Sequence, residues 1–136
     1  MVATSSPKIT ACVFGASGGI GSAFVARLAD DPGVGLIHAG ARKAPPVTGK
    51  ISPFAFDLQD DATIEAAAQT IGPIDLTIIA TGMLRGDHIL PEKSLRTQSA
   101  DAYSHPFAIN TIGPALIGKH LLPQLPKDRR SIFAVL

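Results

Sequence analysis

The glycine-rich segment Gly15–Gly21 constrains the fold of this chain more than any other part of its sequence. It follows an apolar run, Ile9–Phe14, that is typical of a buried strand. It also opens a stretch, Ile20–Ala29, in which apolar residues recur at helical spacing. A strand that turns at once into a helix needs backbone angles that glycine adopts readily. The sequence therefore predicts a strand–turn–helix unit near the start of the chain.

The same segment has the chemistry of an anion site. Residues without a side chain let a phosphate approach the backbone closely, and the free N–H groups at a helix start attract negative charge. After a strand and before a helix, this pattern favours the pyrophosphate of a dinucleotide. The residues expected to hold it are Gly15, Ser17, Gly18, Gly19, Ile20 and Gly21. The alternative is a tight turn whose glycines serve only the packing of the helix on the strand.

The rest of the chain alternates apolar runs with helical periods. Further strands are expected over 36–41, 51–56, 74–80 and 132–136, and helices over 62–70 and most of 99–125. Asp60 or Asp61 can cap the helix over 62–70, whereas Pro106 and Pro114 must kink or divide the long one. This order predicts an α/β fold, a doubly wound parallel sheet of about five strands with helices on both faces.

Two connections are expected to be loops. The segment 44–49 is too short and too rich in proline for the helix that usually crosses between parallel strands. The segment 83–98 is polar and has no clear period. Asp87 and His88 in this second loop could touch a substrate, although the polarity of a loop explains them equally well.

The residues after the second strand bear on which dinucleotide is bound. An Asp or Glu there would hydrogen-bond a ribose 2′-hydroxyl, whereas an Arg accommodates a 2′-phosphate. This sequence has Arg42 and Lys43 at that point and no carboxylate between His38 and Lys43. The prediction is that NADP(H) is preferred, with NAD(H) as the second choice. The alternative is that both cations are merely exposed at a strand end.

Composition supports a buried sheet and argues against several other classes of protein. Hydrophobic residues make up 46% of the chain and charged residues 17%, which suits a sheet covered on both faces. The formal net charge of +1 gives no electrostatic case for a nucleic acid or an anionic membrane as partner. No apolar stretch reaches the roughly 18–20 residues that span a bilayer, and no signal peptide is recognisable. A single cytoplasmic domain over residues 1–136 is therefore expected.

Few side chains could bind a metal or form a disulfide. Cys12 is the only cysteine and lies in an apolar run, which predicts a buried thiol in a reducing compartment. The histidines share no metal-ligand spacing and are expected at the surface or at strand edges, with no metal site; they are His38, His88, His105 and His120. The basic stretch 127–130 is expected to be a solvated turn, and Asp75 to be structural.

The glycine spacing resembles that of the short-chain dehydrogenase/reductase family, and more of the family's landmarks follow in order. Phe56-Asp57-Leu58 resembles the segment after the third strand whose Asp contacts adenine, and Ile79–Gly82 stands where the family has Asn-Asn-Ala-Gly. Asn110-Thr111-Ile112-Gly113 is similar to the Asn-x-x-Gly of the long fourth helix. The resemblance implies further cofactor contacts at Asp57, Leu58, Ala80, Thr81 and Gly82, and a place in the catalytic machinery for Asn110. Residues 81–84 and 91–95 resemble the C-factor-like branch of the family.

The resemblance implies a Rossmann-type domain with strand order 3-2-1-4-5 that binds a nicotinamide dinucleotide. It implies an oxidoreductase that transfers hydride between NADP(H) and a small carbonyl or alcohol substrate. In the family a tyrosine is the general acid–base, a lysine lowers the pKa of that tyrosine, and a serine positions the substrate. These residues follow the fifth strand, where this chain ends, and Tyr103 is followed four positions later by Phe107. The chain is therefore expected to be a domain truncated after the fifth strand that binds cofactor without turnover.

Two other functions are alternatives to a cofactor-binding oxidoreductase domain. One is a non-catalytic module that binds NADPH in regulation or signalling. The other is a structural protein that has lost the cofactor, against which the intact glycines and Arg42 argue. In the family the long helix often forms a dimer interface with a second helix. With that partner absent, Leu116, Leu121 and Leu122 are expected to be exposed and the chain to form homo-oligomers.

Overall fold

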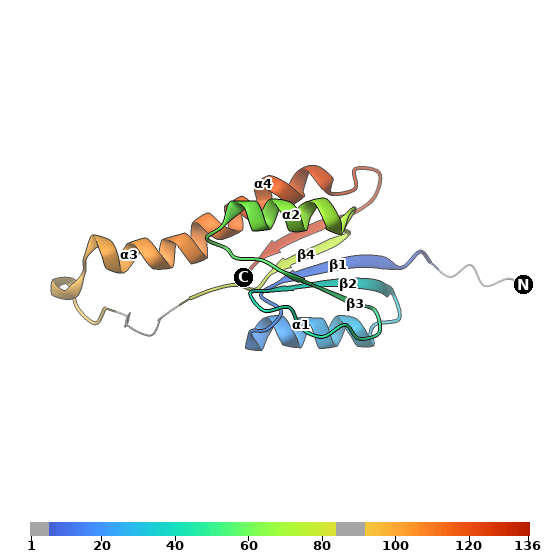
Figure 1. Ribbon diagram of the computed structural model, residues 1–136, viewed down its shortest axis with the longest axis horizontal. Helices are drawn as coiled ribbons and strands as arrows, with labels where there is room; N and C mark the ends of the chain where they lie inside the picture. The colour runs from blue at the N-terminus through green and yellow to red at the C-terminus, as the bar shows by residue number, and fades with distance from the viewer. Residues whose placement is uncertain (1–5, 84–91) are drawn as a thin grey trace, which may run out of the picture.

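The computed structural model describes residues 6–83 and 92–136 (Figure 1). In this part of the chain, the strands form one parallel sheet in the order β3-β2-β1-β4-β5, as predicted. The strands are β1 (Ile9–Phe14), β2 (Val34–Ala41), β3 (Ile51–Ala55), β4 (Leu76–Ile79) and β5 (Ile132–Val135). The helices are α1 (Gly19–Asp30), α2 (Asp61–Ile71), α3 (Ala100–Phe107) and α4 (Gly113–Leu121). Short 3-10 turns lie at Leu95–Thr97 and Leu122–Gln124.

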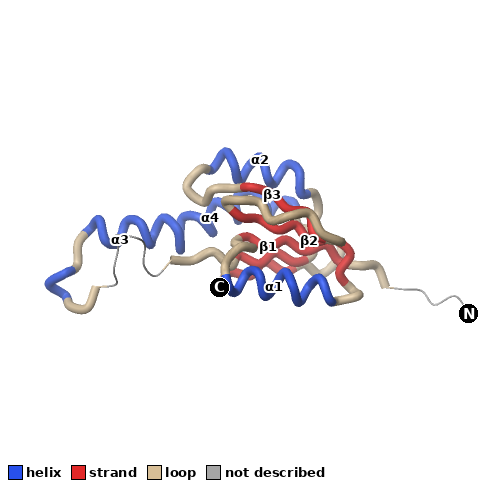
Figure 2. The backbone as a smooth tube through the Cα atoms, turned by 60° about the horizontal axis from the view of Figure 1, so that its bottom comes forward, coloured by secondary structure: helices blue, strands red, loops and turns tan. Residues whose placement is uncertain are grey.

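Helices cover both faces of the sheet, as Figures 1 and 2 show. α1 lies on one face, and α2 and α4 pack side by side on the other. α3 continues past the carboxyl ends of the strands and away from the sheet. Because β1 has β2 on one side and β4 on the other, the strand order reverses at β1. A crevice is expected at the carboxyl ends of strands where such a reversal occurs.

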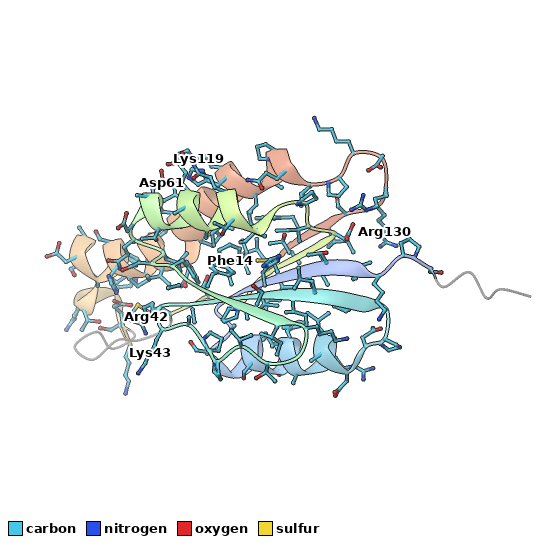
Figure 3. The ribbon with its side chains drawn as sticks, turned by 45° about the vertical axis from the view of Figure 1, so that its right-hand side comes forward. Phe14, Arg42, Lys43, Asp61, Lys119 and Arg130 are labelled. Atoms are coloured by element: carbon cyan, nitrogen blue, oxygen red, sulfur yellow. The ribbon has the colours of Figure 1, made fainter. Side chains whose placement is uncertain are left out.

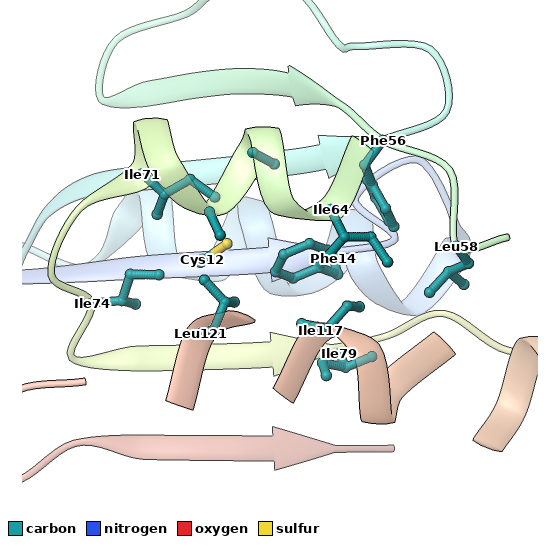
Figure 4. Packing of buried hydrophobic residues seen from close by; sticks show 12 residues of the cluster. Cys12, Phe14, Phe56, Leu58, Ile64, Ile71, Ile74, Ile79, Ile117 and Leu121 are labelled. Carbon is teal, nitrogen blue, oxygen red and sulfur yellow. The ribbon is translucent and has the colours of Figure 1, made fainter. Parts of the chain in front are cut away.

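The larger hydrophobic core lies between the sheet and the α2–α4 layer (Figure 4). Phe14 is fully buried at its centre and packs edge-on against Phe54 and Phe56, with ring centroids 5.3 and 4.9 Å away. Ile64 from α2 and Ile117 from α4 are also fully buried. Each such side chain contributes about 1.5–3 kcal/mol through burial, so this core fixes both helices on the sheet.

The smaller core joins the opposite face of the sheet to α1. Ala11 and Ile37 are fully buried there, and Val25 and Leu28 of α1 pack against them. Cys12 points instead into the larger core and is fully buried, as predicted. Burial raises the pKa of the Cys12 thiol, so the side chain behaves as a small apolar group.

The helical segment predicted over 99–125 is continuous rather than divided. A π turn, Ala108–Ile112, joins α3 directly to α4, and the Gly113 N–H donates to the carbonyl of Ala108, five residues back. Pro106 lies inside α3, whereas Pro114 lies in the first turn of α4. Proline has no N–H with which to continue the α-helical ladder, and the wider turn directly before Pro114 accommodates that loss.

Other element boundaries agree with the predictions to within two residues. Asp60 is the N-cap of α2, and its side chain accepts a hydrogen bond from the Ala62 N–H at 3.1 Å. The connection between β2 and β3 is a loop, as predicted. Lys50 fixes its end, because the ammonium donates to the carbonyls of Asp31 at 2.6 Å and Val34 at 2.8 Å.

Asp75 ties together the amino ends of neighbouring strands, which confirms its predicted structural role. Its carboxylate accepts hydrogen bonds from the Thr10 N–H at 2.9 Å and from Arg129 Nε at 2.6 Å. Burial by itself would raise the pKa of Asp75, but these two donors outweigh burial and the pKa is lowered. Arg129 therefore does not lie in a purely solvated turn, because its guanidinium pairs with a buried carboxylate.

Two histidines contradict the expected surface positions. His38 lies in β2 and is only 8% exposed, and burial lowers its pKa. The side chain of His120 is 12% exposed and lies 2.7 Å from Asp61 Oδ1, while Lys119 Nζ lies 2.7 Å from Asp61 Oδ2. His120 and Lys119 thus connect α4 to α2. His88 and Asp87 lie outside the described residues.

The expected exposure of the long helix is only partly correct. Leu121 is fully buried in the larger core because it faces the sheet. Leu116 is half-buried against the same core, and Leu122 is 50% exposed. No helix in the described residues is both long and apolar enough to cross a membrane.

Candidate functional site

The glycine turn lies between β1 and α1, at the carboxyl end of the central strand. Gly15 has a φ of +87°, and a Cβ at this position would lie 2.9 Å from the carbonyl carbon and oxygen of Ala80, directly after β4. Gly21 is buried in α1, where a Cβ would overlap the carbonyl oxygen of Gly15. Glycine is therefore required at both positions: at Gly15 because of its positive φ, and at Gly21 because the carbonyl oxygen of Gly15 lies so close. Together they hold the start of α1 against the end of β1.

The start of α1 is open to an external acceptor. Gly18 is the N-cap and provides no side-chain hydrogen bond, and the first turn contains no acidic residue. Gly18, Gly19 and Ile20 are all exposed. The first N–H groups of a helix have no partner within the helix, and they carry a partial positive charge. This end of α1 therefore suits a phosphate group.

The turn forms one wall of a cleft of about 390 Å³ at the carboxyl ends of the strands. Segments that follow β1, β2, β3 and β4 all reach it, together with α3 and the π turn. Its lining residues are Gly15, Ser17, Gly18, Ala41, Arg42, Phe56, Asp57, Leu58, Gln59, Ala80, Thr81, Gly82, Met83, His105 and Ile109. A hollow of about 540 Å³ between α4 and β5 is larger, but no glycine turn lines it, and α4 continues there from the π turn, so its first N–H groups are not free.

Most of the predicted cofactor residues meet in this cleft, but not all of them line it. Gly19, Ile20 and Gly21 are outside the lining. Gly19 and Ile20 lie exposed at the start of α1, and Gly21 lies beneath the turn, so its role is packing. Asn110 is also outside the lining, directly after Ile109, which contributes to it.

Charged groups at the cleft differ in how they are bonded. Arg42 is exposed and forms no ion pair with any described residue (Figure 3). Asp57 is fixed by its own loop, since its N–H donates to Thr63 Oγ1 at 2.9 Å and its Oδ1 accepts from the Gln59 N–H at 2.9 Å. Among the described residues, the cleft therefore presents one cation without an ion pair, beside a carboxylate whose position is set.

Asn110 holds the loop that follows β4. Its Oδ1 accepts from the Met83 N–H at 2.7 Å, and its Nδ2 donates to the Met83 carbonyl at 2.7 Å. Both ends of the amide are thus used on one residue of the backbone. The π turn carries Asn110 to this position. Asn110 is therefore a positioning residue for the segment Thr81–Met83.

Several residues of the cleft wall were not predicted from the sequence. His105 was expected at the surface, yet it lines the cleft together with Ile109, one helical turn further along. His105 and Ile109 are four positions apart on one helical segment and so share a face, which is the signal that could have grouped them. Gln59 and Met83 were also missed, because they follow predicted site residues directly and carry no motif of their own.

Solved structures with the same architecture are numerous. An NADPH-bound carbonyl reductase from chicken fatty liver superposes with a TM-score of 0.73 at 22% identity. A short-chain dehydrogenase from Burkholderia cenocepacia in complex with NADP gives 0.70 at 22% identity, and the ligand-free aldohexose dehydrogenase of Thermoplasma acidophilum gives 0.67 at 19%. The matches cover 88%, 87% and 87% of this chain. The chain has the fold of a short-chain dehydrogenase/reductase.

The shared fold accounts for only part of those enzymes. The chain spans 49% of the carbonyl reductase, 47% of the short-chain dehydrogenase and 44% of the aldohexose dehydrogenase. No protein-family model matches the sequence, and no curated protein sequence matches it either. The short-chain dehydrogenase/reductase fold thus explains the arrangement of sheet, turn and cleft, and the residues of the cleft must carry the argument about function.

Proposed function

We propose that this chain binds NADP(H) in the cleft at the carboxyl ends of its strands. In this proposal it forms the cofactor-binding part of an oxidoreductase that acts on a carbonyl or alcohol substrate. One observation carries the proposal: a helix start with free N–H groups borders the same cleft as Arg42, which pairs with no residue that the structure describes. A dinucleotide with a 2′-phosphate has anionic groups at the matching places, on its pyrophosphate and on its adenosine ribose.

The sheet order supports one way of placing the dinucleotide in the cleft. Arg42 follows β2, the glycine turn follows β1, and Thr81 follows β4, and these strands are neighbours in the order β2-β1-β4. With the 2′-phosphate on Arg42 and the pyrophosphate at the start of α1, the nicotinamide side extends toward β4. Asp57 and Leu58, after β3, then lie on the adenosine side, as the resemblance implies.

Several residues of this chain fit such a ligand. A Cβ on Gly19 would meet no atom within 4 Å, so the backbone at the start of α1 is open to a phosphate. Arg42 can form paired, charge-assisted hydrogen bonds with a phosphate, which a lysine cannot match in geometry. The NADPH and NADP named for the chicken and Burkholderia structures agree with this assignment. When bound, the nicotinamide would supply or accept the hydride.

For the reaction itself, the described residues provide positioning. Asn110 fixes the backbone beside the nicotinamide side of the cleft through its two bonds to Met83. The chain has no Tyr-x-x-x-Lys, and the single tyrosine, Tyr103, is 42% exposed on α3 beside Phe107. We therefore expect the chain to bind NADP(H) without reducing a carbonyl compound. A regulatory module would also bind NADPH. It would differ from an oxidoreductase only in that every longer form of the protein would also lack activity.

The test is a pair of fluorescence titrations of the chain, one with NADPH and one with NADH. NADPH is expected to bind more tightly, and Arg42→Ala should weaken NADPH binding by roughly 10- to 100-fold while changing NADH binding little. Lys127→Ala, which removes an exposed cation outside the cleft lining, is the matched control and should change neither. Failure of the unaltered chain to bind either nucleotide would overturn the proposal. If Arg42→Ala weakened the binding of NADPH and NADH equally, Arg42 would not be the residue that binds the 2′-phosphate.

A further inference from the structure

Thr81 lies where the glycine turn closely approaches the end of β4. A Cβ on Gly15 would lie 3.0 Å from the backbone nitrogen of Thr81. Two residues further along, Asn110 fixes the backbone of Met83 with two hydrogen bonds of 2.7 Å. The backbone of Thr81 is therefore set from both sides, with little freedom to move when a ligand enters.

The hydroxyl group of Thr81 is nevertheless without a partner. Three buried side-chain atoms lack a hydrogen bond to any described residue, namely His38 Nε2, Thr77 Oγ1 and Thr81 Oγ1. Of the three residues, Thr81 is the one that lines the cleft. A buried hydroxyl that makes no hydrogen bond lowers stability, and native proteins keep few of them. Such a group beside a ligand cleft calls for an explanation in terms of the ligand.

The orientation of the side chain shows how a ligand could reach this hydroxyl. Thr81 is half-buried, but its Oγ1 is buried, so its exposed part consists of carbon and backbone atoms. Rotation about the Cα–Cβ bond carries Oγ1 to another staggered position, and threonine commonly occupies more than one of them. In a new position the hydroxyl can face the cleft. Nothing is lost inside the protein, because the buried hydroxyl has no hydrogen bond to break.

We propose that Thr81 turns its hydroxyl into the cleft and hydrogen-bonds the nicotinamide-side half of the bound dinucleotide, at its nicotinamide-side phosphate or the ribose attached to that phosphate. This inference rests on the proposed function. The neighbouring Gly15 belongs to the turn assigned to the pyrophosphate, and β4 lies on the side of β1 opposite Arg42. The contact is particular to this sequence, since Thr81 stands where the resembling family pattern has alanine.

The experiment compares Thr81→Val, which removes the hydroxyl at nearly constant shape, with Thr81→Ser, which keeps it. NADPH binding is expected to weaken about five- to tenfold in Thr81→Val and to stay close to the original in Thr81→Ser. Adenosine 2′,5′-bisphosphate, which lacks the nicotinamide-side half, should bind equally well to all three proteins. The melting temperature of ligand-free Thr81→Val should equal or exceed that of the original chain, because an unpaired buried group is gone. Thr77→Val is the matched control: it should behave likewise in melting and bind NADPH normally.

Each contrary result has a distinct meaning. If Thr81→Val binds NADPH as tightly as the original, or if Thr81→Ser is as weak as Thr81→Val, the hydroxyl makes no contact and the inference fails. A clear fall in melting temperature together with equal weakening of both ligands would show a structural role and would also overturn it. If the original chain binds neither NADPH nor adenosine 2′,5′-bisphosphate, the proposed function fails and this inference fails with it.

Discussion

The sheet has an amino edge, where its strands begin, and a carboxyl edge, where its strands end. The polar groups at these two edges are bonded in opposite ways. At the amino ends of the strands, the carboxylate of Asp75 accepts from Thr10 and Arg129, and Lys50 donates to two carbonyls. At the carboxyl ends, the start of α1 has no side-chain cap, Arg42 has no ion pair in the described part of the chain, and the buried hydroxyl of Thr81 has no partner there either. Figure 3 places Arg42 and Arg130 at these two opposite ends.

Under the proposed function, this difference separates residues that stabilise the fold from residues that bind the dinucleotide. Unpaired polar groups cost stability, so a fold keeps them only where something else compensates. Both edges belong to the same strands and lie beside the same hydrophobic side chains. A difference in how the strands pack therefore does not explain why polar groups are paired at one edge and unpaired at the other. A change at the amino edge should therefore reduce stability and leave nucleotide affinity intact, whereas polar changes at the carboxyl edge should do the reverse.

Gly21→Ala should have the largest effect, because α1 packs tightly against the glycine turn at this position. The new Cβ would overlap the carbonyl oxygen of Gly15, so the turn and α1 must separate. We expect the free energy of unfolding to fall by about 3 kcal/mol, as measured by urea denaturation, with loss of NADPH binding.

Gly19→Ala is the matched control for that substitution. A Cβ on Gly19 meets no atom within 4 Å, and alanine is favoured over glycine in a helix, so stability should change by no more than about 1 kcal/mol. If both variants lost stability equally, close approach at Gly21 would not be what fixes the turn.

Asp75→Asn should have the next largest effect, and it tests the amino edge. The substitution leaves Arg129 without its charged partner and should lower the free energy of unfolding by about 2 kcal/mol at pH 7. The affinity of the folded protein for NADPH should not change. Weakened NADPH binding in the folded variant would contradict the separation between the two edges.

Acid titration sharpens the same prediction, because the pKa of Asp75 is lowered in the folded protein. The contribution of Asp75 is complete above the ordinary carboxyl pKa, about 3.9, and is lost as the pH falls through the lowered folded value. The stabilities of the original chain and of Asp75→Asn should therefore differ at neutral pH and converge below about pH 4. A difference that persisted in strong acid would show that ionisation of Asp75 is not its source.

Lys119→Met should have the smallest effect, although it also removes an ion pair. Hydrogen bonds from Lys119 and His120 lower the pKa of Asp61, but the side chains of Lys119 and Asp61 are 57% and 41% exposed. Solvent screens such a pair, so the melting temperature should change by less than about 1 °C. A loss comparable to that of Asp75→Asn would mean that exposure does not distinguish the two pairs.

Short-range patterns predicted most of the fold. The strands, the helices and the glycine turn follow from apolar runs, helical periods and glycine spacing, all of which are local signals, whereas the strand order was implied by the family resemblance. The pairing of side chains was not predictable in this way. Asn110 meets Met83 across 27 positions, and Arg129 meets Asp75 across 54, so both contacts depend on how the elements pack.

The burial of several side chains was also not predicted. His38 occupies the central part of β2, where both faces of the sheet are covered, and its polarity made it look like an edge residue. Leu121 faces the sheet rather than a missing partner, which helical spacing alone does not determine. The π turn that carries Asn110 to Met83 has no recognised sequence signature beyond Pro114, which follows it.

The most direct test of the separation between the two edges is an NMR titration of the ¹⁵N-labelled chain with NADPH. We expect the largest shifts at the amide groups of Ser17, Gly19, Arg42 and Thr81 at the carboxyl edge, and none at Thr10 or Asp75 at the amino edge. Shifts confined to the hollow between α4 and β5, or no shifts at all, would contradict the assignment of the cleft as a dinucleotide site.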